Sequence, residues 1–154
     1  MTEEPKKILI VEDEAPASKI LSDVLAREGF KVIETRNGEE GLDAALREYP
    51  AVIILDILMP GMDGLTVARK LREDEWGALV PIVLLTNVGT SQQEAEEIDS
   101  DIIYLVKTEW KLEKVVQVVK EIIEVEGYFP RGDRKPGDVM DKVKKRLGLQ
   151  NSSA

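Results

Sequence analysis

The chain contains neither cysteine nor histidine. Without cysteine it has no disulfides, thiolate nucleophiles or cysteine-ligated metals. Without histidine it lacks the commonest general base, the commonest metal ligand and any phosphohistidine step of its own. Its chemistry must therefore use carboxylates, hydroxyls, lysine and arginine. A hard, oxygen-seeking cation such as Mg²⁺ fits this inventory better than zinc.

Long apolar runs are also absent. No stretch of the sequence approaches the ~20 apolar residues that a membrane-spanning helix needs. Residues 1–7 are mostly polar, and the apolar run that follows them is too short for a signal peptide. We therefore expect a cytoplasmic protein without a membrane partner, and its 154 residues correspond to about one domain.

Basic residues are scarce in most of the chain and concentrated at its end. Residues 1–126 hold 14 Lys and Arg against 27 Asp and Glu, a net of −13, and residues 127–154 hold 7 against 3, a net of +4. We predict an acidic domain over residues 1–126 and a linker with a short basic helix or tail over residues 127–154. An acidic domain is a poor match for nucleic acid, which leaves the tail as the candidate for such binding.

Five short apolar runs predict buried, parallel β-strands. These runs are Lys6–Val11, Lys31–Thr35, Ala51–Leu55, Pro81–Thr86 and Asp101–Val106. Segments with helical spacing lie between them, so five strands are predicted to alternate with five helices. Strict alternation indicates an α/β fold with a doubly wound, five-stranded parallel sheet and helices on both of its faces.

Local signals support several of the helices. Asn37 followed by Glu40 is a variant of the capping box, and Asp63 can cap the next helix. The last helix of the domain is predicted at about residues 111–126, and a short basic helix at about residues 138–147. One face of the basic helix carries Val139, Met140, Val143 and Leu147. We expect this helix to dock on the acidic domain; a solvated helix is the alternative.

Polar residues mark the carboxyl ends of four predicted strands, where open α/β sheets bind ligands. Glu12 and Asp13 follow the first strand, Asp56 the third and Lys107 the fifth, and Thr86 ends the fourth. With strand order 2-1-3-4-5 the carboxylates converge, and Lys107 lies two strands from Asp56, roughly 10 Å away. Each residue alone is more often a cap, a turn former or a surface charge. Together they provide the groups that phosphoryl transfer to an aspartate needs.

Residues 5–126 resemble the receiver domain of two-component response regulators, in a stand-alone, chemotaxis-regulator-like form. The resemblance is carried by four motifs, Ile8–Glu14, Asp56–Gly64, Leu84–Thr86 and Tyr104–Lys107. The most specific is Asp56–Gly64, with the sequence DILMPGMDG, which is similar to the phosphorylation loop of the family. The resemblance implies a flavodoxin-like sheet with strand order 2-1-3-4-5 and a role in signal transduction.

The resemblance also implies a role for each acidic residue at the strand ends. Asp56 would be the phosphoryl acceptor. Glu12, Asp13, Asp56 and the backbone carbonyl of Leu58 would bind or orient Mg²⁺ as the cofactor. No enzymatic activity is implied beyond the phosphorylation and dephosphorylation of the chain itself.

Three further residues would respond to the phosphoryl group. Thr86 would donate a hydrogen bond to its oxygens, Lys107 would pair with them, and Tyr104 would turn inward as the switch aromatic when Thr86 moves. The partners implied are a sensor histidine kinase or phosphotransfer protein and an unidentified downstream protein. The downstream protein would bind near the fourth helix, fifth strand and fifth helix, and a phosphorylation-dependent homodimer is a further expected form.

The chain departs from the family pattern at three places. Thr108 stands where the family usually has proline, so we expect a trans peptide bond before it and expect its hydroxyl to cap the last helix of the domain. Asn87 replaces a small residue and would narrow access to the acceptor. Leu58 and Val88 are apolar and cannot orient an attacking water, so we predict slow self-dephosphorylation.

Two other functions compete with this interpretation. A phosphorylation-independent scaffold would keep the fold without using the acceptor, and Thr108 and Asn87 leave this alternative open. A phosphatase with an aspartate nucleophile would place that nucleophile after the first strand, with a second aspartate two residues later. Residues 12–14 are Glu-Asp-Glu and do not match that pattern.

Overall fold

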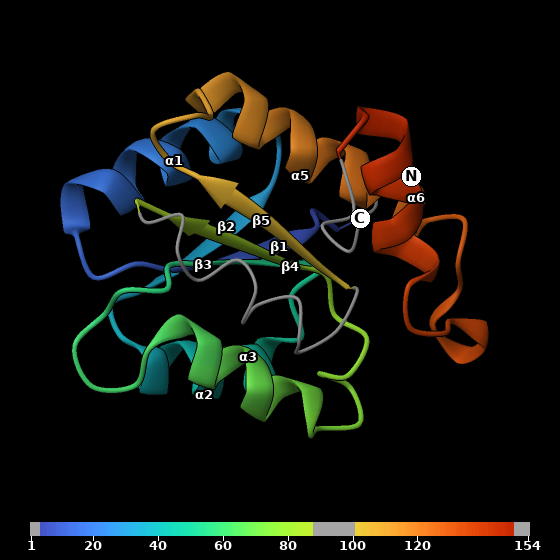
Figure 1. Cartoon of the computed structure of the whole chain (residues 1–154), viewed down its shortest axis with the longest axis horizontal. Helices are drawn as coiled ribbons and strands as arrows, with labels where there is room; N and C mark the ends of the chain where they lie inside the picture. The colour runs from blue at the N-terminus through green and yellow to red at the C-terminus, as the bar shows by residue number, and fades with distance from the viewer. Residues whose placement is uncertain (1–3, 88–100, 150–154) are drawn as a thin grey trace.

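The computed structural model describes residues 4–87 and 101–149. Its centre is a five-stranded parallel sheet in the order β2-β1-β3-β4-β5 (Figure 1). The strands are β1 (Lys7–Val11), β2 (Lys31–Thr35), β3 (Val52–Leu55), β4 (Ile82–Thr86) and β5 (Ile102–Val106). Each strand begins within one residue of its predicted start and stops at its predicted end. The predicted fold class and strand order are therefore confirmed.

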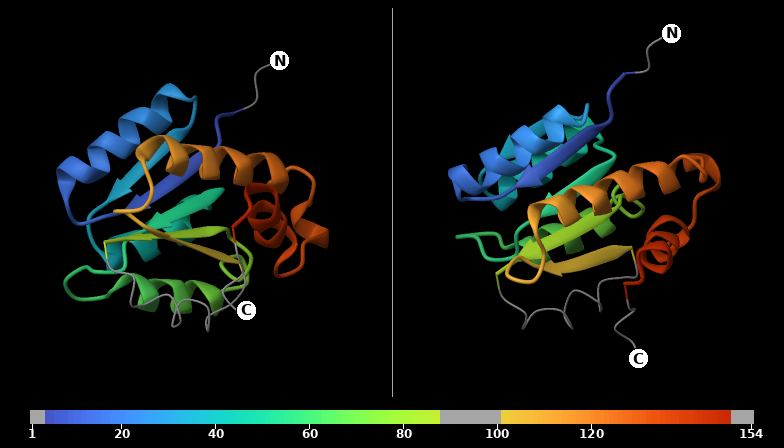
Figure 2. Two further views of the ribbon diagram at one scale, coloured as in Figure 1. Left: turned by 45° about the horizontal axis from the view of Figure 1, so that its top comes forward. Right: turned by 90° about the horizontal axis from the view of Figure 1, so that it is seen from above.

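Helices cover both faces of the sheet, as predicted. They are α1 (Ala15–Arg27), α2 (Gly38–Glu48), α3 (Gly64–Arg72), α5 (Leu112–Glu126) and α6 (Asp138–Leu147). Figures 1 and 2 show α1 and α5 on one face of the sheet and α2 and α3 on the other. The helix predicted between the fourth and fifth strands falls in residues 88–100, outside the described residues. Within the described ranges, no helix combines the length and the apolar character needed to cross a membrane.

The predicted helix caps at Asn37 and Asp63 are both present. The Asn37 side chain accepts a hydrogen bond from the backbone N–H of Glu40 at 2.9 Å. Asp63 accepts one from the N–H of Thr66 at 2.8 Å. Each bond satisfies an amide that the first helical turn leaves without a partner. The two caps fix where α2 and α3 begin, at the carboxyl ends of β2 and β3.

The predicted cap at Thr108 is wrong. α5 begins at Leu112, with Lys111 in the N-cap position. Thr108 lies instead in a turn in which the N–H of Glu109 donates to the carbonyl of Val106 at 2.9 Å. This turn closes directly after β5, and only Trp110 lies between it and the N-cap residue Lys111. The Thr108 hydroxyl therefore comes too early in the chain to cap α5.

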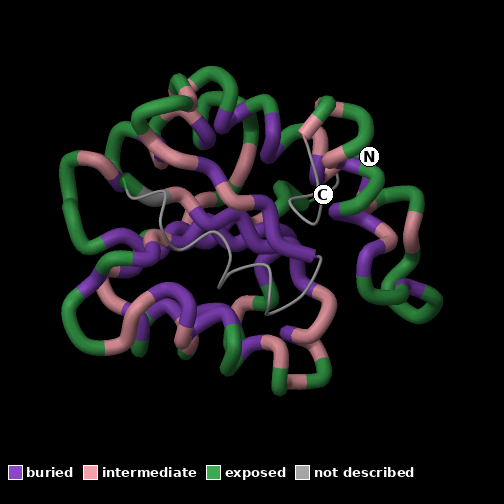
Figure 3. The backbone as a smooth tube through the Cα atoms, in the orientation of Figure 1, coloured by how far each residue is buried: buried purple, intermediate pink, exposed green. Residues whose placement is uncertain are grey.

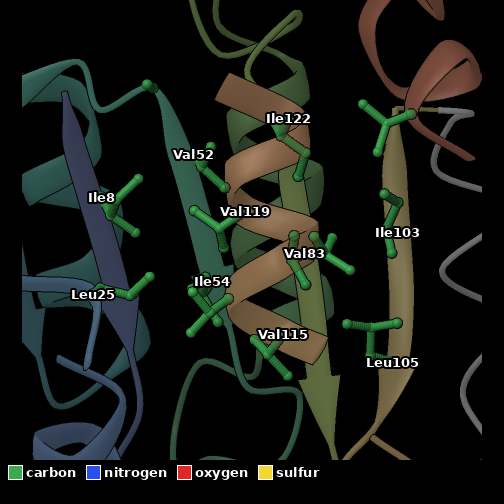
Figure 4. Close-up of a cluster of buried hydrophobic side chains, with 14 of the residues drawn as sticks. Ile8, Leu25, Val52, Ile54, Val83, Ile103, Leu105, Val115, Val119 and Ile122 are labelled. Carbon is green, nitrogen blue, oxygen red and sulfur yellow. The ribbon is translucent and has the colours of Figure 1, made fainter. Parts of the chain in front are cut away.

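Alternating side chains of the strands form two apolar clusters, one on each face of the sheet. Ile8 and Ile10 of β1 pack with α1 and α5, whereas Leu9 and Val11 pack with α2 and α3. Figure 3 shows that the central strands are buried, and Figure 4 shows α5 lying across β3 and β4. Burial on both faces is typical of parallel sheets and keeps the strands in fixed register.

The C-terminal helix is docked on the rest of the chain, not solvated. α6 contacts α5 and β5, and its apolar residues Val139, Met140 and Val143 are buried. The docking of α6 therefore agrees with the sequence-based expectation. The expected cause is attraction between opposite charges, whereas the contact in the structure is largely apolar. The boundary between domain and tail at residue 126 stays a prediction.

Candidate functional site

The carboxyl ends of β1 and β3 bring three acidic residues together. These strands pair directly, with Val11 opposite Leu55, and the N–H of Asp56 donates to the carbonyl of Val11 at 3.0 Å. Glu12 and Asp13 continue from β1 beside Asp56. Oxygen atoms of the three carboxylates lie within 4.8 Å of one another. The structure thus brings together the acidic residues that the sequence singles out.

The loop after Asp56 is held in a compact shape with the help of two glycines. Gly61 has a φ of +78°, which residues with a side chain rarely adopt. A Cβ at Gly64 would overlap the carbonyl oxygen of Asp56, and the N–H of Gly64 donates to the carbonyl of Ile57 at 2.9 Å. The N–H of Leu58 donates to the Asp56 carboxylate at 3.3 Å. The loop therefore fixes the carboxylate and leaves the Leu58 side chain exposed beside it.

Lys107 directly follows β5, the edge strand of the sheet, and its side chain reaches the acidic residues along the same carboxyl edge. Its Nζ lies 2.5 Å from Oε1 of Glu12 and 3.8 Å from Oδ2 of Asp56. The peptide bond between Lys107 and Thr108 is trans, as predicted, since no peptide bond within residues 4–87 and 101–149 is cis. The side chain therefore spans the strands between β5 and β1 without a proline after it. The closer partner, Glu12, is a finding of the structure that the sequence does not predict.

The three charged groups shift one another's pKa values. Burial, together with the neighbouring Glu12 carboxylate, raises the pKa of Asp56 from 3.8 to about 7. Burial alone would raise the pKa of Glu12, but hydrogen bonds with Lys107 and Asp56 lower it below its usual value. Burial would also lower the pKa of Lys107, but Glu12 and Asp56 raise it. Lys107 and Glu12 are therefore a charged pair, and Asp56 takes up a proton near neutral pH when no other cation is near.

The other predicted residues lie on or after β4 and β5. Thr86 is the last residue of β4, the strand next to β3. The position of its side chain lies outside what the structure describes, as does Val88. Asn87 is exposed, and Tyr104 of β5 is half-buried and packs on the cluster formed by α2 and α3. The backbone thus puts Thr86 at the predicted edge of the sheet, and the roles of Thr86 and Tyr104 stay predictions.

A second group of residues supports the acidic turn, and the sequence-based prediction misses it. Glu12 is bound at both backbone groups by the end of β2: its N–H donates to the carbonyl of Thr35 at 3.1 Å, and its carbonyl accepts from Arg36 at 3.4 Å. Arg36 also pairs with Glu34 at 3.1 Å, and Glu34 accepts a hydrogen bond from the buried Ser18 at 2.8 Å. The strand-end rule could have indicated Arg36, because this residue follows β2.

A hollow of about 250 Å³ opens beside the acidic residues. Glu12, Asp56 and Lys107 form its polar end, and the remaining walls are mainly apolar residues of α1, the sheet and the start of α5. Trp110 and the exposed Ile20 are among the residues that line it. A second molecule therefore has room to approach the carboxylates from the side of α1 and α5.

Carboxylate oxygens in this arrangement suit a hard divalent cation. Mg²⁺ in proteins is usually bound by one or two carboxylates and keeps several waters. Glu12 is buried and paired with Lys107, whereas Asp13 is exposed and Asp56 is partly buried. Asp13 and Asp56 are therefore more accessible to a cation than Glu12 is. The donor set fits Mg²⁺, because the whole chain has no cysteine or histidine that would favour a softer metal.

The chain matches the model of the response regulator receiver domain over residues 8–120. It therefore belongs to this family, as the motifs at its strand ends predict. The matched range begins in β1, stops within α5 and does not include α6.

Two curated relatives show how much of a longer regulator the chain resembles. The probable transcriptional regulator ycf27 of Porphyra purpurea is 42% identical over 89 residues, which are 58% of this chain and 35% of ycf27. The transcriptional regulatory protein SrrA of Staphylococcus aureus is 39% identical over 94 residues, which are 61% of this chain and 38% of SrrA. The matches thus span little more than a third of the length of these relatives.

Solved structures of response regulators share the fold. TrrA of Thermotoga maritima, solved in complex with Mg²⁺ and BeF, is 32% identical, with a TM-score of 0.67 over 75% of this chain and 96% of that chain. The chemotaxis response regulator CheY4 of Vibrio cholerae is 26% identical, with a TM-score of 0.69 over 75% of this chain and 97% of that chain. These similarities agree with the receiver fold of the family model.

Proposed function

We propose that this chain is a phosphoacceptor response regulator in which Asp56 receives a phosphoryl group. The donor would be a phosphohistidine of a sensor kinase or phosphotransfer protein, or a small phosphodonor. The observation that carries the proposal is the convergence of the Glu12, Asp13 and Asp56 carboxylates with the Lys107 ammonium group. Membership of the receiver family and the Mg²⁺ and BeF complex of the T. maritima relative support it.

In the transfer, a carboxylate oxygen of Asp56 forms a bond to phosphorus while the bond from phosphorus to the donor breaks. Lys107 can exchange Glu12 for the phosphoryl oxygens, since its Nζ already lies 3.8 Å from Asp56. Glu12, Asp13, Asp56 and the carbonyl of Leu58 would hold Mg²⁺, which when bound supplies further positive charge to the phosphoryl oxygens. The protein thus contributes mainly positioning and charge neutralisation.

The phosphorylated state would be relayed by residues on the neighbouring strands. Thr86, at the end of β4, would donate a hydrogen bond to the phosphoryl group, and Tyr104 of β5 would turn inward as Thr86 moves. A downstream protein would recognise the changed surface, and a phosphorylation-dependent homodimer is a second form to test. We expect the chain to act in the cytoplasm and to catalyse nothing beyond its own phosphorylation and dephosphorylation.

Incubation with acetyl phosphate and Mg²⁺ tests the acceptor. We expect wild type to gain the mass of one phosphoryl group in intact-protein mass spectrometry, and Asp56→Asn to gain none. Asp23→Asn is the matched control, because Asp23 is an exposed aspartate of α1. EDTA should prevent labelling of wild type. No labelling of wild type, or equal labelling of Asp56→Asn, would contradict the proposal and favour a phosphorylation-independent scaffold.

A further inference from the structure

The last helix covers a face of the chain that would otherwise be apolar. α6 lies beside α5 and also contacts β5 (Figures 1 and 2). Val139, Met140 and Val143 of α6 are 2%, 0% and 0% exposed. They belong to the same core cluster as Ile103 of β5 and Val125 of α5. If α6 left this position, apolar side chains of α5 and β5 would lose their cover.

α5 has two buried apolar flanks, and only one of them packs on the sheet. One stripe lies against the strands in Figure 4 and consists of Val115, Val119 and Ile122. Val118 and Val125 are also buried, and they share a second flank with Glu121, which lies one helical turn from each of them. Glu121 pairs with Arg146 of α6 at 2.7 Å. The second flank of α5 therefore faces α6.

Polar contacts hold α6 at its two ends. Near its carboxyl end, Arg146 pairs with Glu121 and, at 3.4 Å, with Glu124. Before its first turn, the N–H of Gly137 donates to both carboxylate oxygens of Asp101 at 2.8 and 2.7 Å. Partly exposed ion pairs such as those of Arg146 are weak, whereas Asp101 is buried. The carboxyl end of α6 is thus the more easily loosened of the two.

Departure of α6 would not break the pairing of the strands, because β5 is held in the sheet by β4. The helix has 10 residues, and helices shorter than about 12–15 residues are marginal in water without tertiary packing. It follows residues 127–137, a segment with three glycines and two prolines that connects it to α5. This segment would keep a released α6 close to its own binding face.

We propose that α6 is a tethered ligand of a helix-binding face, formed by Val118, Glu121 and Val125 of α5 with Ile103 of β5, and that its release opens this face to a partner protein. α6 shows the chemistry that fits: apolar residues at positions i, i+1 and i+4, and a cation at i+7. The partner is therefore a protein with a basic amphipathic helix. This inference goes beyond phosphoryl transfer and does not depend on it.

A thiol introduced into the full-length chain can report the release, because the chain has no cysteine. Met140→Cys places the thiol in α6, and Leu25→Cys places it in α1; both native side chains are 0% exposed. Ellman's reagent should modify Met140→Cys at least ~10 times faster than Leu25→Cys, because local opening precedes global unfolding. Equal rates would show that α6 opens only with the whole domain and would overturn the proposal.

Two further comparisons keep the test decisive. Val143→Cys in α6 and Val52→Cys in β3, at positions that are also 0% exposed, repeat the comparison of modification rates. Replacing valine by cysteine changes the side-chain volume less than replacing methionine or leucine does. Adding Arg146→Glu should accelerate Met140→Cys by a further ~3–10-fold, because it replaces an attraction to Glu121 with a repulsion. Leu25→Cys should keep its rate in that background. Equal acceleration of both thiols would again overturn the proposal.

A fluorescent peptide of residues 138–149 tests the face as a binding site. Fluorescence anisotropy should show that it binds full-length Arg146→Glu, whose own α6 is loosened, at least ~10 times more tightly than wild type. Combining Glu121→Arg with Arg146→Glu should abolish this binding. The two exchanged charges again attract each other within the chain, and the new charge at position 121 repels Arg146 of the peptide. A Met140→Asp peptide is the control and should not bind. Failure of the unaltered peptide to bind Arg146→Glu would overturn the proposal.

Discussion

The two ends of β5 are held by different kinds of contact. After its carboxyl end, Lys107 pairs with Glu12 and approaches Asp56 in a partly exposed group of charges. Before its amino end, the buried carboxylate of Asp101 binds the backbone N–H of Gly137, which leads into α6. A flexible ammonium group can exchange one partner for another, whereas a backbone amide is fixed by the fold. The kind of partner therefore separates the charge proposed to take part in phosphoryl transfer, Lys107, from the charge that anchors α6, Asp101.

The largest effect that would test this comparison concerns Lys107. Lys107→Met should slow phosphorylation by acetyl phosphate about 100-fold, because the phosphoryl oxygens lose a positioned positive charge. A time course of intact mass measures the rate. Lys120→Met is the control, since Lys120 is an exposed lysine of α5. Reaction of Lys107→Met at the wild-type rate would mean that the pair with Glu12 is structural, like the contact of Asp101.

At the amino end of β5 we expect a substitution to change stability and not phosphorylation. Asp101→Ala should lower the free energy of unfolding by about 2–3 kcal/mol, because the Gly137 amide loses its charged acceptor in a buried position. Urea denaturation measures the change. Asp43→Ala, at an exposed aspartate of α2, should have little effect. Phosphorylation of Asp101→Ala should stay within about twofold of wild type; a much larger loss would show that the two ends of the strand are coupled.

The raised pKa of Asp56 can be tested by measuring the free energy of unfolding instead of a phosphorylation rate. In metal-free protein at neutral pH, Asp56→Asn should raise the free energy of unfolding by about 1–3 kcal/mol. The pKa of Asp56 is about 7 in the folded chain and 3.8 as the reference value. The folded chain therefore binds more protons between these values, and the contribution of Asp56 to stability falls as the pH rises through that range.

Urea denaturation in EDTA at several pH values measures this difference. The variant does not titrate at this position, so its advantage should be near zero at the reference value of 3.8 and largest above pH 7. Glu12, Asp13 and Lys107 are the charged groups around Asp56 and are present in both proteins. A constant advantage at every pH would contradict the raised pKa. Asp101→Asn, at the other end of β5, should instead lower stability.

Much of the carboxyl end of the sheet can be predicted from the sequence. Glu12, Asp56 and Lys107 each follow an apolar run, and parallel strands necessarily bring such residues to one edge. The pairing of Lys107 with Glu12 cannot be predicted in this way. Both acids lie within reach of one long side chain, and the choice between them depends on distances that residue types do not specify.

The amino end of β5 is much harder to predict. The apolar face of α6 indicates that this helix packs on something, but not that it packs on α5 and β5. The contact between Asp101 and Gly137 joins residues 36 apart through a backbone amide. No residue type or spacing marks an amide as a partner, because every residue except proline has one. Thr108 failed as a cap for a related reason, since the turn after β5 depends on backbone geometry and not on the hydroxyl.

The smallest expected effect concerns Leu58, whose side chain is 55% exposed beside Asp56. This apolar side chain cannot orient a water, so phosphorylated wild type should lose its phosphoryl group slowly. Leu58→Asn adds a carboxamide that can orient a water towards phosphorus and should speed the loss roughly 3–10-fold. The decay of the phosphorylated mass after removal of the donor measures both rates.

Leu46→Asn, at an exposed leucine of α2, is the control for Leu58→Asn and should decay as wild type does. Loss of the phosphoryl group from wild type within seconds would refute the prediction. If wild type is slow and Leu58→Asn is equally slow, Leu58 does not limit hydrolysis. Val88, the other apolar residue that cannot orient a water, would then be the next position to substitute.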